Sequence, residues 1–337
     1  MLECSLASDL ECSYANDKND IYTCMTMNLK LKNTNSLITS IKGQHMSGKR
    51  IIDVEGLLVV RSNNKYLSSS IFEKIPYLKV LSVMYFSVEK IVEGNFNGAV
   101  NLKYIYINNN GITELGNNIF KGASKLLLID LKVNGIHTVQ GKTFAGLTTL
   151  EHINLNHNNL KTLPKEVFDD LINLKFLKIL GNMLESLDGN LFKNNLNLVH
   201  ILLSNNYLSI IGPNLLKSLT YLKYAGFFNN PCINAKFNDT VEIHVFNDKI
   251  ASCTEFNKPE QKLINAESEK DVLTHKISLQ NSKIKVLNQD VKVLLKNIST
   301  EANKTTKCHE SNQQKLIELK YCQNEMNKTK FAFKCFH

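Results

Sequence analysis

The chain has 337 residues, 43% of them hydrophobic, which is enough to bury a core in two or three domains. Its formal net charge of +9 comes from lysines scattered along the chain, without the basic stripe, stacking aromatics or reading helix that nucleic-acid binding requires, so we expect no nucleic-acid partner. No apolar stretch approaches the roughly 20 residues of a transmembrane helix, so we expect no membrane span.

Residues 1–53 carry three cysteines, Cys4, Cys12 and Cys24, ahead of any repeat. They predict an N-terminal cap and entry segment that contains a disulfide. The odd number leaves one thiol without a local partner, and the spacing does not say which. Residues 1–10 lack the apolar run of seven or more that a cleavable secretion signal has, so we expect that a leader was removed or was never included.

Residues 54–230 repeat the pattern LxxLxLxxNxL every 24 residues. A phenylalanine column with the same spacing supports the register independently. The first leucines of seven repeats are Leu78, Leu102, Leu126, Leu150, Leu174, Leu198 and Leu222, and the phenylalanines are Phe72, Phe96, Phe120, Phe144, Phe168 and Phe192. A weaker repeat begins at Val54. Because one repeat cannot bury its own apolar face, stacked repeats must share one interior.

The asparagine of the pattern recurs without a break from the repeat of Leu102 onward. Its members are Asn110, Asn134, Asn158, Asn182, Asn206 and Asn230. We expect these side chains to bond the main chain where it turns inside each coil, because buried backbone groups need partners. The pattern predicts a leucine-rich-repeat solenoid, with a curved parallel β-sheet on its concave face and an irregular or short-helical convex side.

Residues 231–258 follow the last repeat and predict a C-terminal cap closed by a Cys232–Cys253 disulfide. All eight cysteines lie outside the repeats, which favours cystines over cytosolic thiols. The cysteines form no CxxC pair and have no histidines at zinc-ligand spacing. Four glycosylation sequons agree with a secreted, extracellular protein; they begin at Asn238, Asn297, Asn303 and Asn327.

Strand residues between the framework leucines are expected to face outward on the concave surface. They include aromatic residues of the kind that anchor interfaces, set among polar neighbours. The binding candidates are Tyr104, Tyr106, His152, Phe176, Lys178, His200, Tyr224 and Phe228. The alternative is that these side chains only cover the sheet or pack against a returning C-terminal segment.

No catalytic fingerprint is present: GxSxG, HExxH, P-loop and dinucleotide-binding motifs are all missing from the sequence. His152 and His200 share a column, but they lie two repeats apart, roughly 10 Å at ordinary strand spacing. The sequence therefore predicts a protein that is not an enzyme, with no catalytic residues, no cofactor and no metal.

Residues 259–337 lose the leucine frame and show a heptad pattern. The predicted coiled-coil core has β-branched residues at a and mostly leucine at d, a combination that favours parallel pairs, with Gln280 as one polar d position. Its apolar positions are Leu273, Ile277, Ile284, Leu287, Val291, Leu294 and Ile298. The alternative is a helix whose apolar stripe packs back on the solenoid.

Three further cysteines in the tail, Cys308, Cys322 and Cys335, are candidates for interchain disulfides. Cys308 and Cys322 both fall on d positions if the heptads continue, which would place them at the seam between two chains. Asn312 and Lys315 would then be core residues, so the helix could instead break and the cysteines pair within one chain. The e and g positions specify no partner, and both homodimer and heterodimer stay open.

A cystine-capped 24-residue leucine-rich repeat followed by a cysteine-bearing coiled coil resembles the mosquito leucine-rich-repeat immune proteins. That resemblance implies a protein of the haemolymph that pairs with a second leucine-rich-repeat chain, linked through Cys308 or Cys322, and holds a complement-like thioester protein. An innate-immune scaffold that binds such a protein or a pathogen-associated ligand is therefore expected. The alternative is the ectodomain of a ligand-binding receptor, or an extracellular-matrix-type protein, that binds through its concave face.

Overall fold

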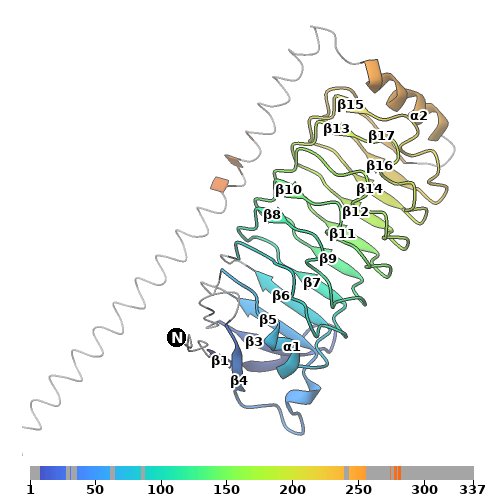
Figure 1. Cartoon of the computed structure of the whole chain (residues 1–337). Coiled ribbons are helices and arrows are strands. Elements are labelled where there is room, and N and C mark those ends of the chain that lie inside the picture. Colours follow the sequence, from blue (N-terminus) through green and yellow to red (C-terminus); the bar gives the residue numbers. More distant parts are fainter. Residues whose placement is uncertain are drawn as a thin grey trace, which may run out of the picture. The chain divides into compact units, whose positions relative to one another are not determined.

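The computed structural model of the chain describes residues 8–27, 31, 36–60, 65–84, 88–238 and 243–255, together with 274, 277, 278, 280 and 281. The chain divides into two compact units, Met1–Val272 and Leu273–His337. The first unit is a parallel β-solenoid with few helices, in which successive coils stack on one another (Figure 1). This is the architecture that the 24-residue repeat predicted.

One eleven-stranded sheet runs the length of the solenoid, and each coil adds one strand to it. The strands are parallel except for the first and last pairs, which are antiparallel. In spatial order they are β2 (Ser13–Asn16), β3 (Tyr22–Thr26), β5 (Gly56–Val60), β6 (Val80–Met84), β7 (Tyr104–Tyr106), β9 (Leu128–Asp130), β11 (His152–Asn154), β12 (Phe176–Lys178), β14 (His200–Leu202), β16 (Tyr224–Gly226) and β17 (Lys236–Phe237).

Away from this sheet the coils consist mainly of turns and short strand pairs. The pairs are β1 (Ser8–Glu11) with β4 (Ile38–Lys42), β8 (Glu114–Leu115) with β10 (Thr138–Val139), and β13 (Ser186–Leu187) with β15 (Ile210–Ile211). The short helical segments are η1 (Ile51–Asp53), α1 (Ser70–Lys74), α2 (Ile243–Ala251) and η3 (Ser252–Glu255). Within the described part of the repeats the far side is thus mostly irregular rather than helical.

Proline explains why the β8–β10 pair does not continue into β13. The N–H of Gln140 donates to the carbonyl of Leu115, and that of Gly212 donates to the carbonyl of Leu187. The residue at the equivalent position of the intervening coil is Pro164, which has no N–H to donate. The second line of strands is therefore interrupted at that coil.

The phenylalanine column forms a continuous stack through the interior. Neighbouring rings from Phe72 to Phe192 have centroids 5.4–6.2 Å apart. All six rings are buried, together with the framework leucines. A full burial of one such side chain stabilises by roughly 1.5–3 kcal/mol, so the stack contributes strongly to holding successive coils together.

Each asparagine of the column links its own coil to the preceding one. Asn182 illustrates it: its Nδ2 donates to the carbonyls of Leu155 and Ile179, at 3.0 and 3.2 Å, and its Oδ1 accepts the N–H of Leu160 at 3.1 Å. The bonds to the preceding coil repeat at all six positions, with the acceptor carbonyl 27 residues back and the donor N–H 22 residues back. Asn182 itself is fully buried.

The residue before each of these asparagines has a left-handed backbone. The column consists of Asn109, Val133, His157, Gly181, Asn205 and Asn229, with φ between 54° and 68°. Asparagine and glycine adopt this conformation readily, whereas a β-branched residue does so only with strain. Val133, at φ 55°, is therefore the strained member of the column.

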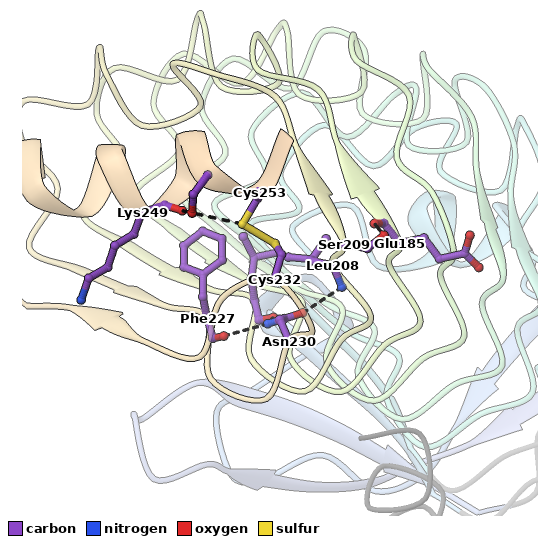
Figure 2. Close-up of a disulfide and its surroundings, with 10 residues drawn as sticks. Glu185, Leu208, Ser209, Phe227, Asn230, Cys232, Lys249 and Cys253 are labelled. Carbon is purple, nitrogen blue, oxygen red and sulfur yellow. Dashed lines mark hydrogen bonds between the residues drawn. A yellow bond between two sulfur atoms is a disulfide. The ribbon is translucent and has the colours of Figure 1, made fainter. Parts of the chain in front are cut away.

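A disulfide lies at each end of the solenoid. At the N-terminal end Cys12 is bonded to Cys24 of β3. The sequence had left open which of the three N-terminal cysteines pair, and the third, Cys4, lies outside the described residues. At the other end Cys232 is bonded to Cys253, the pair that the sequence pointed to. Figure 2 shows this bond beside Asn230, the last asparagine of the column.

Helix α2 covers the last coil. Phe246 is buried against Phe227 and Phe237, with ring centroids 5.6 and 6.1 Å away. Ile250 is buried as well. The helix thus shields the apolar interior that an open end would expose to water.

In the second unit the five described residues, including Ile277 and Gln280, are helical and exposed. The other predicted coiled-coil core residues lie outside the described residues, as do Cys308, Cys322 and Cys335. The coiled coil and its interchain disulfides therefore stay predictions.

Replacing Asn182 by alanine should lower the free energy of unfolding by about 3 kcal/mol, because three buried main-chain groups lose their partner. The measurement is equilibrium denaturation in urea. Asn173→Ala is the matched control, since that side chain makes one exposed bond to Thr148 and its loss should cost less than about 1 kcal/mol. Equal losses in both variants would contradict the role given to the asparagine column.

Replacing Val133 by asparagine should raise the free energy of unfolding by about 1 kcal/mol, because asparagine tolerates the left-handed backbone that strains valine. Val100→Asn makes the same chemical change at an exposed position without positive φ, and we expect a change within about 0.5 kcal/mol. Thermal unfolding of the two variants tests this. A destabilised Val133→Asn protein would refute the assignment of strain.

Candidate functional site

The outward side chains of the eleven-stranded sheet, opposite the core, form what we call the sheet face. On it, four rings from adjacent strands stand in one line: His152 of β11, Phe176 of β12, His200 of β14 and Tyr224 of β16. We call this line the ring row. The sheet register places these residues directly beside one another, and each is half-buried.

The rings of the row contact one another along its whole length. His152 and Phe176 are stacked, with centroids 4.5 Å apart and planes only 2° from parallel. Phe176 and His200 are 5.1 Å apart, and His200 and Tyr224 are 6.1 Å apart, both pairs tilted. Because these distances are typical of favourable aromatic pairs, the row is a preorganised surface rather than four independent side chains.

The remaining candidates also lie on the sheet face, but not in one group. Tyr104 and Tyr106 come from β7, half-buried and separated from the ring row by β9. Burial raises the pKa of Tyr106, and the neighbouring Tyr104 adds to the effect. Lys178 is exposed on β12, and Phe228, just after β16, is 39% exposed. The candidates therefore divide between β7 and the coils of the ring row.

Charges beside the ring row are mostly positive. Glu151 is paired with Lys175 at 2.9 Å. Lys178 and Lys223 flank Phe176 and Tyr224 and are exposed, with no carboxylate partner among the described residues. The row thus lies in a region with more unpaired cations than anions.

The pKa of His152 depends both on the burial of its ring and on these charges. Burial in the row lowers its pKa below the ordinary histidine value, and Lys178 and Lys175 lower it further. Glu151 acts in the opposite direction. At neutral pH the ring of His152 is therefore held in its neutral form, which suits its stack against Phe176.

Glycine shapes the end of the row, a feature that the sequence pattern did not identify. A Cβ placed on Gly226 would lie 3.1–3.3 Å from the ring and hydroxyl of Tyr224. The tyrosine ring therefore lies over the glycine of its own strand. A larger residue at 226 would require Tyr224 or Ser204 to shift by a few tenths of an ångström.

A second surface that the sequence analysis missed lies at the N-terminal end of the sheet face. Strand β3 joins the main sheet, and its register aligns Met25 with Leu58 of β5 and Ser82 of β6. Met25 is 38% exposed and Met27 is 58% exposed. The apolar character of the sheet face thus extends beyond the repeats into the cap, where no repeat frame marks it.

The described part of the chain contains neither a metal-binding cluster nor a membrane-spanning helix. Among those residues no three His, Cys, Asp or Glu side chains are grouped so as to hold a metal ion. None of the helices in the described residues is long and apolar enough to cross a bilayer.

The family model described as leucine rich repeat matches residues 100–147 and 124–184. Residues 100–184 are leucine-rich repeats. Strands β7 to β12, with the first half of the ring row, belong to these leucine-rich repeats. The search of curated proteins finds no match. A solved structure of a TLR13–ssRNA13 complex is similar at 18% identity and a TM-score of 0.43, covering 54% of this chain and 30% of that chain.

The lowered pKa of His152 predicts how stability depends on pH. The unfolded chain, with a histidine pKa of about 6.5, takes up a proton before the folded protein does. The contribution of His152 to the free energy of unfolding is therefore complete above that value and is lost as pH falls toward the folded pKa. His152→Gln should lose less thermal stability between pH 7.5 and pH 5 than the unmodified protein.

The matched control is His137→Gln, which replaces an exposed histidine away from the sheet face. It should keep the pH dependence of the unmodified protein in the same melting experiment. An unchanged pH dependence in His152→Gln would show that His152 does not titrate as described.

Proposed function

We propose that this chain is an extracellular protein-binding scaffold and that the ring row is the centre of its binding surface. The row supports this because large, rigid side chains at the centre of a patch supply most of the energy of protein interfaces. Its rings are already ordered against one another, so a partner would pay little additional side-chain entropy on binding.

The proposal of an extracellular location rests on two observations. The described residues contain two disulfides, at opposite ends of the solenoid, and disulfides persist in oxidising compartments. The sequon at Asn238 lies on an exposed residue just after β17, where a glycan could be accommodated. The other three sequon asparagines lie outside the described residues.

We further propose an innate-immune role, in which the tail pairs two leucine-rich-repeat chains and the solenoid engages a complement-like thioester protein. The support is the resemblance of the whole arrangement to the mosquito immune proteins and the heptads that end in Cys308 and Cys322. Function transferred by architecture is an analogy, so the partner requires a direct test.

A receptor ectodomain or a matrix-type ligand-binding protein is the second candidate function. It is favoured by the position of the ring row on the sheet face, because this surface needs no second chain to be complete. In that case the solenoid would bind its ligand as a monomer.

Binding at the ring row is tested with the chain expressed through a secretory leader and a purified complement-like thioester protein as the probe. The double variant Phe176→Ser with Tyr224→Ser should weaken binding at least tenfold, because it removes two central anchors. The control is Tyr221→Ser, which removes a tyrosine that is 64% exposed outside the strands. Absence of binding, or equal binding by both variants, would contradict the proposed surface or partner.

Pairing through the tail is tested on reducing and non-reducing gels, with light scattering in solution. A disulfide-linked dimer should be present and should be lost in Cys308→Ser or in Cys322→Ser, because both cysteines fall at the predicted seam. A monomer under all conditions would overturn the covalent pair and favour the receptor-type alternative.

A further inference from the structure

The best-stacked pair of the ring row, His152 and Phe176, exposes ring edges rather than ring faces. His152 and Phe176 turn their ring faces toward each other, at 2° from parallel, so the parts of these rings that reach solvent are their edges. Ring edges carry partial positive charge, whereas ring faces carry partial negative charge. A partner group that meets the edge of Phe176 therefore meets weakly positive C–H groups, and the edge of the neutral His152 ring beside it carries one N–H donor and one acceptor nitrogen.

The polar side chains beside the row also present donors. The Oδ1 of Asn154 accepts the N–H of Asn156, and the Oδ1 of Asn156 accepts the N–H of Leu180. Both acceptor oxygens are thus used by the main chain. The side-chain N–H groups of these two asparagines have no partner among the described residues, and they are available to an acceptor on a partner.

The charged side chains beside the ring row that have no carboxylate partner among the described residues are lysines, so their charge is positive. Lys178 lies on β12 in the column next to the row, and Lys223 immediately precedes Tyr224. The carboxylate of Glu151, which precedes His152 of the row, is paired with Lys175. Asp130, in the column of Asn154 on the neighbouring strand, is buried and accepts the N–H of Lys132. The edge of Phe176, the amide donors and the unpaired lysines thus all favour an anionic, acceptor-rich partner.

We infer that the ring row and its flanking lysines bind an acidic segment of a protein partner. This inference rests on the proposed function and specifies the chemistry of the partner. Its carboxylates would meet Lys178, Lys223 and the asparagine amides, while apolar side chains between them would pack on the rings. The row spans three strand spacings, about 14 Å, which an extended segment of four to five residues would cover.

Two other possible occupants of the ring row, the tail of this chain and a second copy of the chain, lack the acidic charge that the row favours. Residues 256–337 hold fifteen lysines and nine acidic residues, so the tail is itself basic. A second copy of the chain carries the same net charge of +9. Complementary potentials across an interface favour a partner of opposite sign.

The test uses two labelled eight-residue peptides, one alternating Glu and Tyr and one alternating Lys and Tyr, with the full chain and fluorescence anisotropy. The acidic peptide should bind, and its affinity should fall with salt; the basic peptide should not bind. Lys178→Glu with Lys223→Glu should weaken binding of the acidic peptide at least about tenfold. The matched control, Lys125→Glu with Lys217→Glu, reverses two exposed lysines off the sheet face and should retain binding.

Equal binding of the two peptides, or equal losses in the two double variants, would overturn the inference, because general charge would then explain the result. The thioester-protein assay separates this outcome from failure of the proposed function. If binding there depends on Phe176 and Tyr224 but not on Lys178 and Lys223, the acidic partner is wrong and the binding surface stands. If it depends on neither pair, the proposed surface fails as well.

Discussion

From the coil of Asn110 onward, the main chain of each coil must turn away from the sheet inside a dry interior, and one asparagine amide per coil satisfies that turn. The amide both donates and accepts, so a single side chain can bond carbonyls of two coils and the N–H of the preceding one. A leucine in the same place would fill the volume but leave these main-chain groups unpaired, which costs about 1–3 kcal/mol for each. The stacking of the coils depends on this bond.

The regular alignment of side chains on the sheet face results from the stacking of the coils. Because each coil repeats after 24 residues, side chains at one position of the repeat fall directly beside each other on neighbouring strands. The column of the ring row has valine, tyrosine and leucine in β6, β7 and β9, and continuous rings only from β11 to β16. A periodic scaffold thus carries a non-periodic surface, and specificity for a partner can arise without any change in the core.

The sequence predicted what the repeat itself determines. The leucines, the phenylalanine stack and the asparagine bonds follow from a 24-residue period, and the outward columns follow from strand alternation. Features that depend on the exact backbone could not be predicted in this way. The strain at Val133 requires a left-handed φ that its residue type disfavours, and the effect of Gly226 depends on how Tyr224 lies over it.

The ends of the solenoid were harder to predict because they have no period. Nothing in the sequence of the first 53 residues indicates that Tyr22–Thr26 pairs with Gly56–Val60 and extends the main sheet. As a result the sequence analysis missed the exposed methionines Met25 and Met27 on the sheet face. The number of cysteines at this end left the pairing open, and only the structure joins Cys12 to Cys24.

The most direct test of the account is hydrogen exchange at the amides that donate to the asparagine column. Five of them belong to Ile112, Ile136, Leu160, Leu184 and Leu208. If the column holds the coils together, these amides should exchange only through unfolding of the solenoid, with the same slow rate as the central strand amides. Fast or independent exchange at these five positions would show that the coils are held in register by something else.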